Sequence, residues 1–272
     1  IVKEPHIYRV RMYSFARAAE RIGESRPDNG HPRVWRGKEY HRMGHVLGSI
    51  VKDLLSRLWF RSNQAGWNPY LFEWYFRRTS MGRSIRAKEE EVVFNFLGTV
   101  MKPHHSVVDI GSGTGNYTVP VANRCAGVVA VDSSPEMLGY LRERCRRERL
   151  FNIDLRMGNL PEDLGGSERF DGVLAIGVLN YVESLEDSLH TLSSILKPGG
   201  WAIFNVPVST LEGRLYVLEE LLLWRRRINI LSFEEMRRLT ERVGLRVRAM
   251  APAGLSRGGL TCFLLATSPT IL

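Results

Sequence analysis

The stretch from Val107 to Asp132 constrains the fold of this chain more than any other part of the sequence. It consists of an apolar run ending on an acid, Asp109, then a glycine-rich turn, a short helical run, and a second apolar run ending on Asp132. Short apolar runs separated by a glycine turn and a helix are typical of strands in a parallel α/β sheet. Such sheets bind nucleotide-like ligands at the carboxyl ends of their strands. We therefore expect a binding site where these two runs end.

The same alternation of strand and helix patterns continues to the end of the chain. The patterns predict strands at residues 107–110, 128–132, 153–157, 170–176, 201–206, 245–250 and 260–267. They predict helices at 117–124, 185–196 and 211–224, and two more that begin at the cap-like runs 133–136 and 232–235. Repeated strand–helix units indicate an α/β fold with a doubly wound, mostly parallel, seven-stranded sheet. Since only a short turn joins the last two strands, the last strand is expected to insert antiparallel.

The first hundred residues differ from the rest in charge. They hold 18 Lys and Arg against 10 Asp and Glu, and four of the six tryptophans, whereas residues 101–272 hold 20 against 19. Helices are predicted at residues 8–21, 46–59, 71–78 and 84–97, the last with Ser84 as its cap. We therefore divide the chain into a basic, aromatic N-terminal helical extension or lid, residues 1–83, and a main domain, residues 84–272.

The residues around the glycine turn indicate which ligand it binds. A dinucleotide loop needs a glycine at its sixth position, where this chain has Asn116. Asp109, two residues before Gly111, would repel a pyrophosphate and attract an ammonium group. Asp132 follows Gly111 by 21 residues, where an acid can accept hydrogen bonds from both ribose hydroxyls. A ligand with an ammonium group, a ribose and no phosphate is S-adenosylmethionine (SAM).

The run of residues 107–115, Val-Val-Asp-Ile-Gly-Ser-Gly-Thr-Gly, resembles the first motif of the class I SAM-dependent methyltransferases. The resemblance covers residues 84–272 and is nearest to the small-molecule enzymes of quinone and magnesium-protoporphyrin synthesis. It implies a Rossmann-like methyltransferase fold. The cofactor-binding residues it implies are Asp109, Gly111, Ser112, Gly113, Gly115, Asp132, Ser133, Met137, Asn159, Leu160 and Ile176. Asn159 stands where the family more often has Asp, and an amide can form the same bond to the adenine amino group.

The sequence carries no catalytic signature, and methyl transfer need not have one because much of the enzyme's task is to bring the reactants together. Candidate basic or orienting residues are Tyr75, Asn180 and Tyr181. Residues 176–179 lack the Asn/Asp-Pro-Pro-aromatic run of nucleic-acid amino methyltransferases. The three cysteines show no metal-ligand or disulfide spacing, so no metal is expected and a reducing cytoplasm fits.

Three functional hypotheses follow. The first is methyl transfer to an O or N atom of a small-molecule or amphipathic, lipid-like acceptor, with residues 1–83 as lid and peripheral contact to a membrane surface. The second is an RNA-modifying methyltransferase, in which the same basic and aromatic residues grip phosphates and stack on bases. The third is a SAM-binding protein without catalytic activity. The sequence does not indicate an oligomeric state, and it disfavours nucleic acid as the partner.

Replacing Asp109 with Ala is predicted to abolish SAM binding, because the carboxylate that faces the ligand's ammonium group is lost. Equilibrium binding of SAM to the two proteins measures the effect. An affinity that survives within a few-fold of the original would show that the glycine turn has been misinterpreted.

Overall fold

The structure is a computed structural model in which residues 68–164, 166–224, 228–253 and 261–267 are described. The chain divides into two compact units, Ile1–Ser49 and Ile50–Leu272, and every described residue belongs to the second. The helices predicted at 8–21 and 46–59 lie outside the described residues. The division into residues 1–83 and 84–272 stays a prediction.

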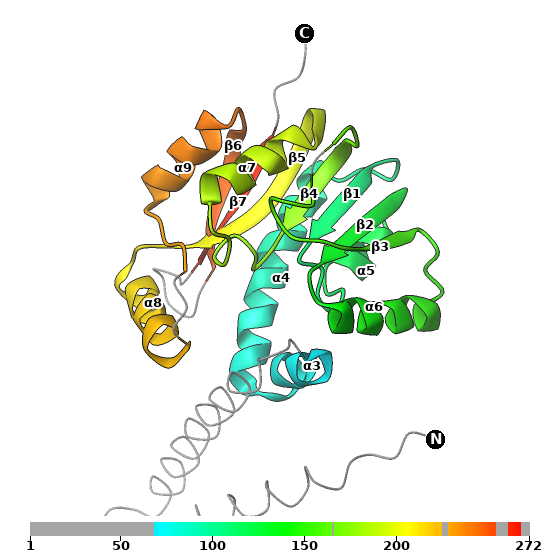
Figure 1. The fold of residues 1–272 in the computed structure, drawn as a ribbon, viewed down its shortest axis with the longest axis horizontal. Coiled ribbons are helices and arrows are strands. Elements are labelled where there is room, and N and C mark those ends of the chain that lie inside the picture. Colours follow the sequence, from blue (N-terminus) through cyan, green and yellow to red (C-terminus); the bar gives the residue numbers. More distant parts are fainter. Residues whose placement is uncertain (1–67, 165, 225–227, 254–260, 268–272) are drawn as a thin grey trace, which may run out of the picture. The chain divides into compact units, whose positions relative to one another are not determined.

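The described part of the second unit is built on a seven-stranded sheet with the strand order β3-β2-β1-β4-β5-β7-β6 (Figure 1). The strands are β1 (Ser106–Ile110), β2 (Gly127–Asp132), β3 (Ile153–Met157), β4 (Phe170–Ala175), β5 (Leu196–Pro207), β6 (Arg246–Ala253) and β7 (Thr261–Thr267). The first five strands pair in parallel, whereas β7 pairs antiparallel with both β5 and β6. This confirms the predicted α/β sheet with its antiparallel last strand.

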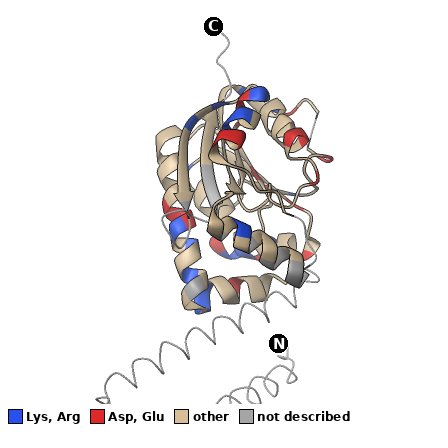
Figure 2. Cartoon of the chain, turned by 90° about the vertical axis from the view of Figure 1, so that its left-hand side faces the viewer, with Lys and Arg blue, Asp and Glu red and all other residues tan. Residues whose placement is uncertain are grey.

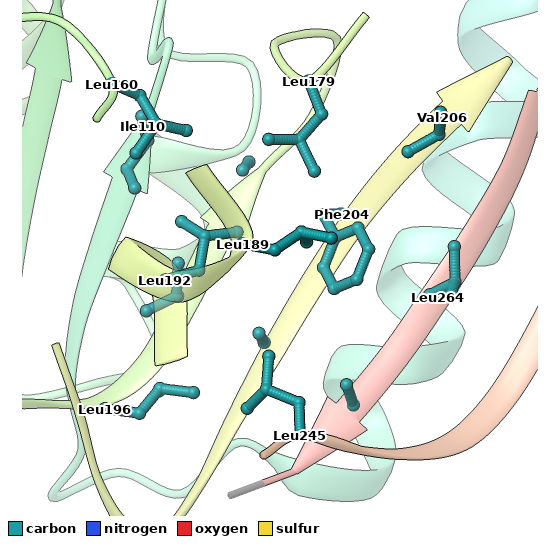
Figure 3. Packing of buried hydrophobic residues seen from close by; sticks show 14 of the residues in the cluster. Ile110, Leu160, Leu179, Leu189, Leu192, Leu196, Phe204, Val206, Leu245 and Leu264 are labelled. Carbon is teal, nitrogen blue, oxygen red and sulfur yellow. The ribbon is translucent and has the colours of Figure 1, made fainter. Parts of the chain in front are cut away.

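Helices cover both faces of the sheet (Figure 1). The helices are α3 (Pro69–Arg78), α4 (Ser80–Val100), α5 (Thr118–Ala122), α6 (Pro135–Glu148), α7 (Leu185–Ser194), α8 (Leu211–Trp224) and α9 (Phe233–Arg242). Alternate residues of each strand point to opposite faces. Accordingly, Val108 packs in one core cluster with α7 and α9, and Val107 packs in another with α4 and α5. Figure 3 shows the first cluster, in which Phe204 of β5 and Leu189 of α7 lie against each other.

Two helix starts follow from local capping. Ser232 accepts a hydrogen bond from the N–H of Glu235, whose carboxylate accepts from the N–H of Ser232. The run 232–235 therefore caps α9 as predicted, and it does so as a capping box. Before α6 the cap is Ser134, the second serine of the predicted run, which accepts from the N–H of Met137 at 3.2 Å. Pro135 then occupies the first helical position, where its missing N–H costs nothing.

Two predicted starts were wrong by four residues or more. The helix assigned to residues 84–97 begins four residues earlier, because Thr79 rather than Ser84 caps it and accepts from the N–H of Gly82 at 2.9 Å. The predicted start of a strand at residue 201 was also late. Leu196 already pairs with Phe170, and the residues between it and Trp201 form an irregularity in β5. Sequence periodicity misses this start because the Pro-Gly-Gly run after Lys197 reads as a turn.

No helix in the described part of the chain is both long and apolar enough to cross a membrane. Lys and Arg residues lie along α3 and α4, and Figure 2 shows them at the end of the unit where these two helices lie. The exposed members are Arg77, Arg78 and Arg83.

Replacing Gly172 with Ala is expected to destabilise the fold by about 1–3 kcal/mol, because a Cβ there would lie 2.2 Å from the indole ring of Trp201. Gly139 in α6 is the matched control, since a Cβ there meets nothing within 4 Å. Its replacement by Ala should stabilise the protein by about 0.5–1 kcal/mol. Urea unfolding followed by tryptophan fluorescence measures both. Equal effects of the two changes would contradict the packing described for Gly172.

Candidate functional site

The loop between β1 and α5 has a backbone that only glycine adopts easily. Gly111, Gly113 and Gly115 have φ angles of +68°, +52° and +82°, in the left-handed region. A Cβ on Gly111 would also lie 2.3 Å from the Val178 side chain, and one on Gly115 would lie 2.3 Å from that of Leu141. The loop therefore presses closely against the β4–α7 loop on one side and α6 on the other.

Asp109, at the end of β1, is 2% exposed and lies under this loop. Its Oδ2 atom accepts a hydrogen bond from the Thr118 hydroxyl at 2.5 Å. Burial raises the pKa of Asp109 to about 7, and the Thr118 hydrogen bond opposes that shift. The carboxyl group is therefore harder to ionise than an exposed Asp, and a nearby cation would favour its ionised form.

Asp132, at the end of β2, joins the glycine loop to the start of α6. One carboxylate oxygen accepts from the N–H of Gly113 at 2.7 Å, and the other accepts from the N–H of Ser134 at 2.9 Å. Burial raises the pKa of Asp132, and these backbone hydrogen bonds oppose the rise. Each carboxylate oxygen can accept a further hydrogen bond, so Asp132 can also accept hydrogen bonds from the hydroxyl groups of a ribose.

Three polar side-chain atoms of the same segment are buried without a hydrogen-bond partner among the described residues: Ser112 Oγ, Asn116 Nδ2 and the Tyr117 hydroxyl. Buried polar groups in native proteins nearly always have a partner. A polar ligand seated on the loop would supply one to Ser112, which was predicted to contact the cofactor. The donors and acceptors present therefore fit SAM.

The other predicted cofactor residues line the strand ends beside this loop. Met137 in α6 is buried, and Ser133, one residue after Asp132, is exposed. Beyond β3, Asn159 is exposed and Leu160 is 8% exposed, and the N–H of Asn159 donates to Asp163 at 2.8 Å. Ile176 follows β4 directly and is half-buried.

The three candidate catalytic residues come from two separate elements. Tyr75 belongs to α3 and is 5% exposed. Asn180, buried, and Tyr181, 40% exposed, lie in the β4–α7 loop.

Two asparagines that the sequence analysis did not identify hold the β4–α7 loop in place. Asn205 of β5 accepts from the N–H of Gly177 at 2.6 Å. The Asn229 side chain donates to the carbonyl oxygens of Leu179 and Val182, at 2.9 Å each. No sequence motif indicated these contacts, because they join positions 28 to 50 residues apart.

Two acids in the N-terminal helices were also missed. Glu73 of α3 accepts a hydrogen bond from the Thr114 hydroxyl in the glycine loop at 2.6 Å. Glu89 of α4 is half-buried, and burial raises its pKa to about 7. Its charge also acts on the buried Tyr117 hydroxyl. In the sequence both acids sit among charged and aromatic helical residues, which gives no sign that the fold partly covers them.

Across the ranges that the structure describes, no three His, Cys, Asp or Glu side chains form a group that could hold a metal ion.

Comparisons with known proteins find similarity to methyltransferases over part of this chain. Residues 107–200 match a protein-family model described as a methyltransferase domain. A demethylmenaquinone methyltransferase of Tropheryma whipplei is 37% identical over 94 residues, which is 35% of this chain and 38% of that relative. A 23S rRNA (uracil(1939)-C(5))-methyltransferase of Alcanivorax borkumensis is 32% identical over 88 residues, 32% of this chain and 19% of that relative. The chain thus spans well under half the length of these curated relatives.

Among solved structures, the magnesium protoporphyrin IX methyltransferase of Synechocystis PCC 6803, determined with bound SAH, aligns with a TM-score of 0.57. The alignment covers 70% of this chain and 87% of that one at 20% sequence identity. This likeness concerns the fold, and it agrees with the sheet described above.

The affinity for SAM is expected to fall as the pH is lowered from 7.5 to 5.5, because a cationic ligand needs Asp109 ionised and the pKa of Asp109 is about 7. Below that pKa the fall should approach about tenfold per pH unit. Isothermal titration calorimetry across this range measures the slope. Asp109→Asn, which also lacks the carboxylate, should bind SAM no better than Asp109→Ala at any pH in this range. In Thr118→Val, which loses the hydroxyl donor, the midpoint of this pH dependence should move up. An affinity that does not depend on pH in the unaltered protein would contradict the role given to Asp109.

Proposed function

Because the chain belongs to the class I SAM-dependent methyltransferases, we propose that it transfers a methyl group from SAM to a small-molecule or amphipathic, lipid-like acceptor, at an oxygen or nitrogen atom. The observation that carries the proposal is the pair of strand-end acids, Asp109 and Asp132, beside a glycine loop whose buried Ser112 hydroxyl has no hydrogen-bond partner in the described part of the chain. This arrangement offers negative charge and hydrogen-bond acceptors for the hydroxyl groups of a ribose, and it suits a cationic ligand that carries no phosphate.

Each part of the site has a role in this proposal. Asp132 accepts hydrogen bonds from the ribose hydroxyls, and its own bonds to the Gly113 and Ser134 N–H groups fix its direction. Asp109 balances the positive charge of the ligand from beneath the loop. Leu160 and Met137 contribute buried apolar surface beside the strand ends, which suits an adenine ring.

Bound SAM supplies an electrophilic methyl group on a positively charged sulfur atom. The chain's residues then have to bind the acceptor, orient it and exclude water, which accounts for much of the rate gain in such a transfer. Asn180 and Tyr181 are the proposed orienting groups, because the loop that carries them is held by Asn205 and Asn229. Tyr75, which belongs to α3, is proposed as a third orienting group.

Exposed apolar side chains support an amphipathic acceptor. In α3, Tyr70 is 72% exposed and Trp74 is 38% exposed. In α8, which follows β5, the side chains of four leucines are exposed at helical spacing: Leu211, Leu215, Leu218 and Leu221. Figure 1 shows α3 and α8 at the same end of the unit, where the first five strands have their carboxyl ends. The T. whipplei relative is named for a methyl transfer to demethylmenaquinone, which is consistent with this class of acceptor.

An RNA acceptor is the second candidate, favoured by the rRNA methyltransferase relative and by the exposed arginines of α3 and α4. Against it, the loop at residues 176–179 reads Ile-Gly-Val-Leu, and the chain has no Pro-Cys pair of the kind that methylates pyrimidine C5. A SAM-binding protein without turnover is the third candidate. Peripheral contact of the basic N-terminal region with a membrane surface is part of the first proposal.

Incubation of the protein with methyl-labelled SAM and a cell extract, followed by separation into lipid, RNA, protein and small-molecule fractions, tests the proposal. Label is expected in the lipid or small-molecule fraction, and it should be lost with Asp109→Ala. Label confined to RNA would favour the second candidate, and tight SAM binding without label in any fraction would favour the third.

A further inference from the structure

We propose that Glu73 is a positioning residue that ties helix α3 to the glycine loop, so that α3 forms part of the SAM site. This inference rests on the proposed function and extends it beyond residues 107–200, the part that matches the methyltransferase family model. It assigns a task to one residue of the basic N-terminal region.

The contact joins a largely covered carboxylate to a buried hydroxyl. The Oε1 atom of Glu73 accepts from the Thr114 hydroxyl at 2.6 Å, and the Oε2 atom pairs with the guanidinium of Arg77 one turn later in α3. Thr114 is 1% exposed, and the side chain of Glu73 is 12% exposed against 66% for Arg77. Hydrogen bonds to an ionised group are roughly twice as strong as those between neutral groups. Where the two groups are covered, water weakens the bond less than it does at the surface.

The main chain at Thr114 is held from the opposite side. The guanidinium of Arg144 in α6 donates to the carbonyl oxygens of Thr114 and Gly115, at 3.3 and 3.1 Å, and also pairs with Glu148 at 2.8 Å. Thr114 is thus clamped by its side chain to α3 and by its carbonyl to α6. The preceding residue, Gly113, donates to Asp132, so a shift of Thr114 would disturb the group proposed to hold the ribose.

Helix α3 is itself fixed by contacts that do not involve Glu73. The ring of Tyr70 meets that of Tyr140 in α6 edge-on, with centroids 5.4 Å apart. Thr79 lies between α3 and α4, where its hydroxyl donates to the carbonyl oxygen of Tyr75 and accepts from the N–H of Gly82, both at 2.9 Å. Glu73 is therefore presented to the loop by packing that should survive its replacement.

The carboxylate also has an electrostatic effect. A cationic ligand on the glycine loop is stabilised by a negative charge held one hydrogen bond away from the loop. Replacing Glu73 with Gln keeps the shape but removes the charge, and replacing it with Ala removes both. The expected loss of SAM affinity is about threefold for Glu73→Gln and about tenfold for Glu73→Ala.

The test is calorimetric titration of the full chain with SAM, with the thermal unfolding midpoint of each variant measured in parallel. Thr114→Val should weaken SAM binding about as much as Glu73→Gln, whereas Thr114→Ser, which keeps the hydroxyl, should bind like the unaltered protein. The double variant Glu73→Ala with Thr114→Val should be little weaker than Glu73→Ala alone, because each change removes the bond between Thr114 and Glu73. Glu143→Gln is the control, because that acid forms an exposed ion pair on α6 with Arg146.

Two outcomes would overturn the inference: SAM affinity unchanged in both Glu73 variants, or fully additive effects of Glu73→Ala and Thr114→Val. In either case a loss of binding in Asp109→Ala would leave the proposed function intact. If the unaltered protein does not bind SAM, the proposed function itself fails. If Glu73→Ala does not fold, the Gln and Val variants still decide the question.

Discussion

The hydrogen bond from the Gly113 N–H to the Asp132 carboxylate is the interaction on which the rest of the site depends. It joins the loop after β1 to the end of β2, and the same carboxylate accepts from the N–H of Ser134, the residue that caps α6. One side chain therefore fixes the loop and the strand end, and it engages the residue that starts α6. The parallel pairing of β1 with β2 brings these parts together.

This arrangement places the buried carboxylate of Asp109 near the half-buried carboxylate of Asp132, which is costly without a compensating charge. Burial raises the pKa of both groups, and the charge of Asp132 adds to the rise at Asp109. Natural proteins tolerate such strain mainly where function requires it. A cationic ligand would supply the missing positive charge, which gives a physical reason for the two acids as well as for the choice of SAM over a dinucleotide.

The sequence predicted the sheet because each strand is a short apolar run bounded by turn residues, and such runs can be read locally. It indicated SAM as the cofactor for a similar reason, since the glycine loop, Asp109 and Asp132 lie within one stretch of chain, whereas the individual cofactor-binding residues stay a prediction. It did not predict that α4 begins at Ser80, because Thr79 and Ser84 are equally plausible caps until the packing of α3 is known. It also missed Glu73, Asn205 and Asn229, whose bonding partners lie far away in the sequence.

The sequence by itself determined the succession of strands and helices along the chain, the glycine loop, and the cofactor expected at that loop. These features depend on residues that lie close together in the chain. Tertiary structure alone decided how the loop is held: from β2 by Asp132, from α6 by Arg144 and from α3 by Glu73. Burial, and with it the raised pKa of Asp109, is likewise a property of the folded chain, because desolvation depends on every element packed around a group.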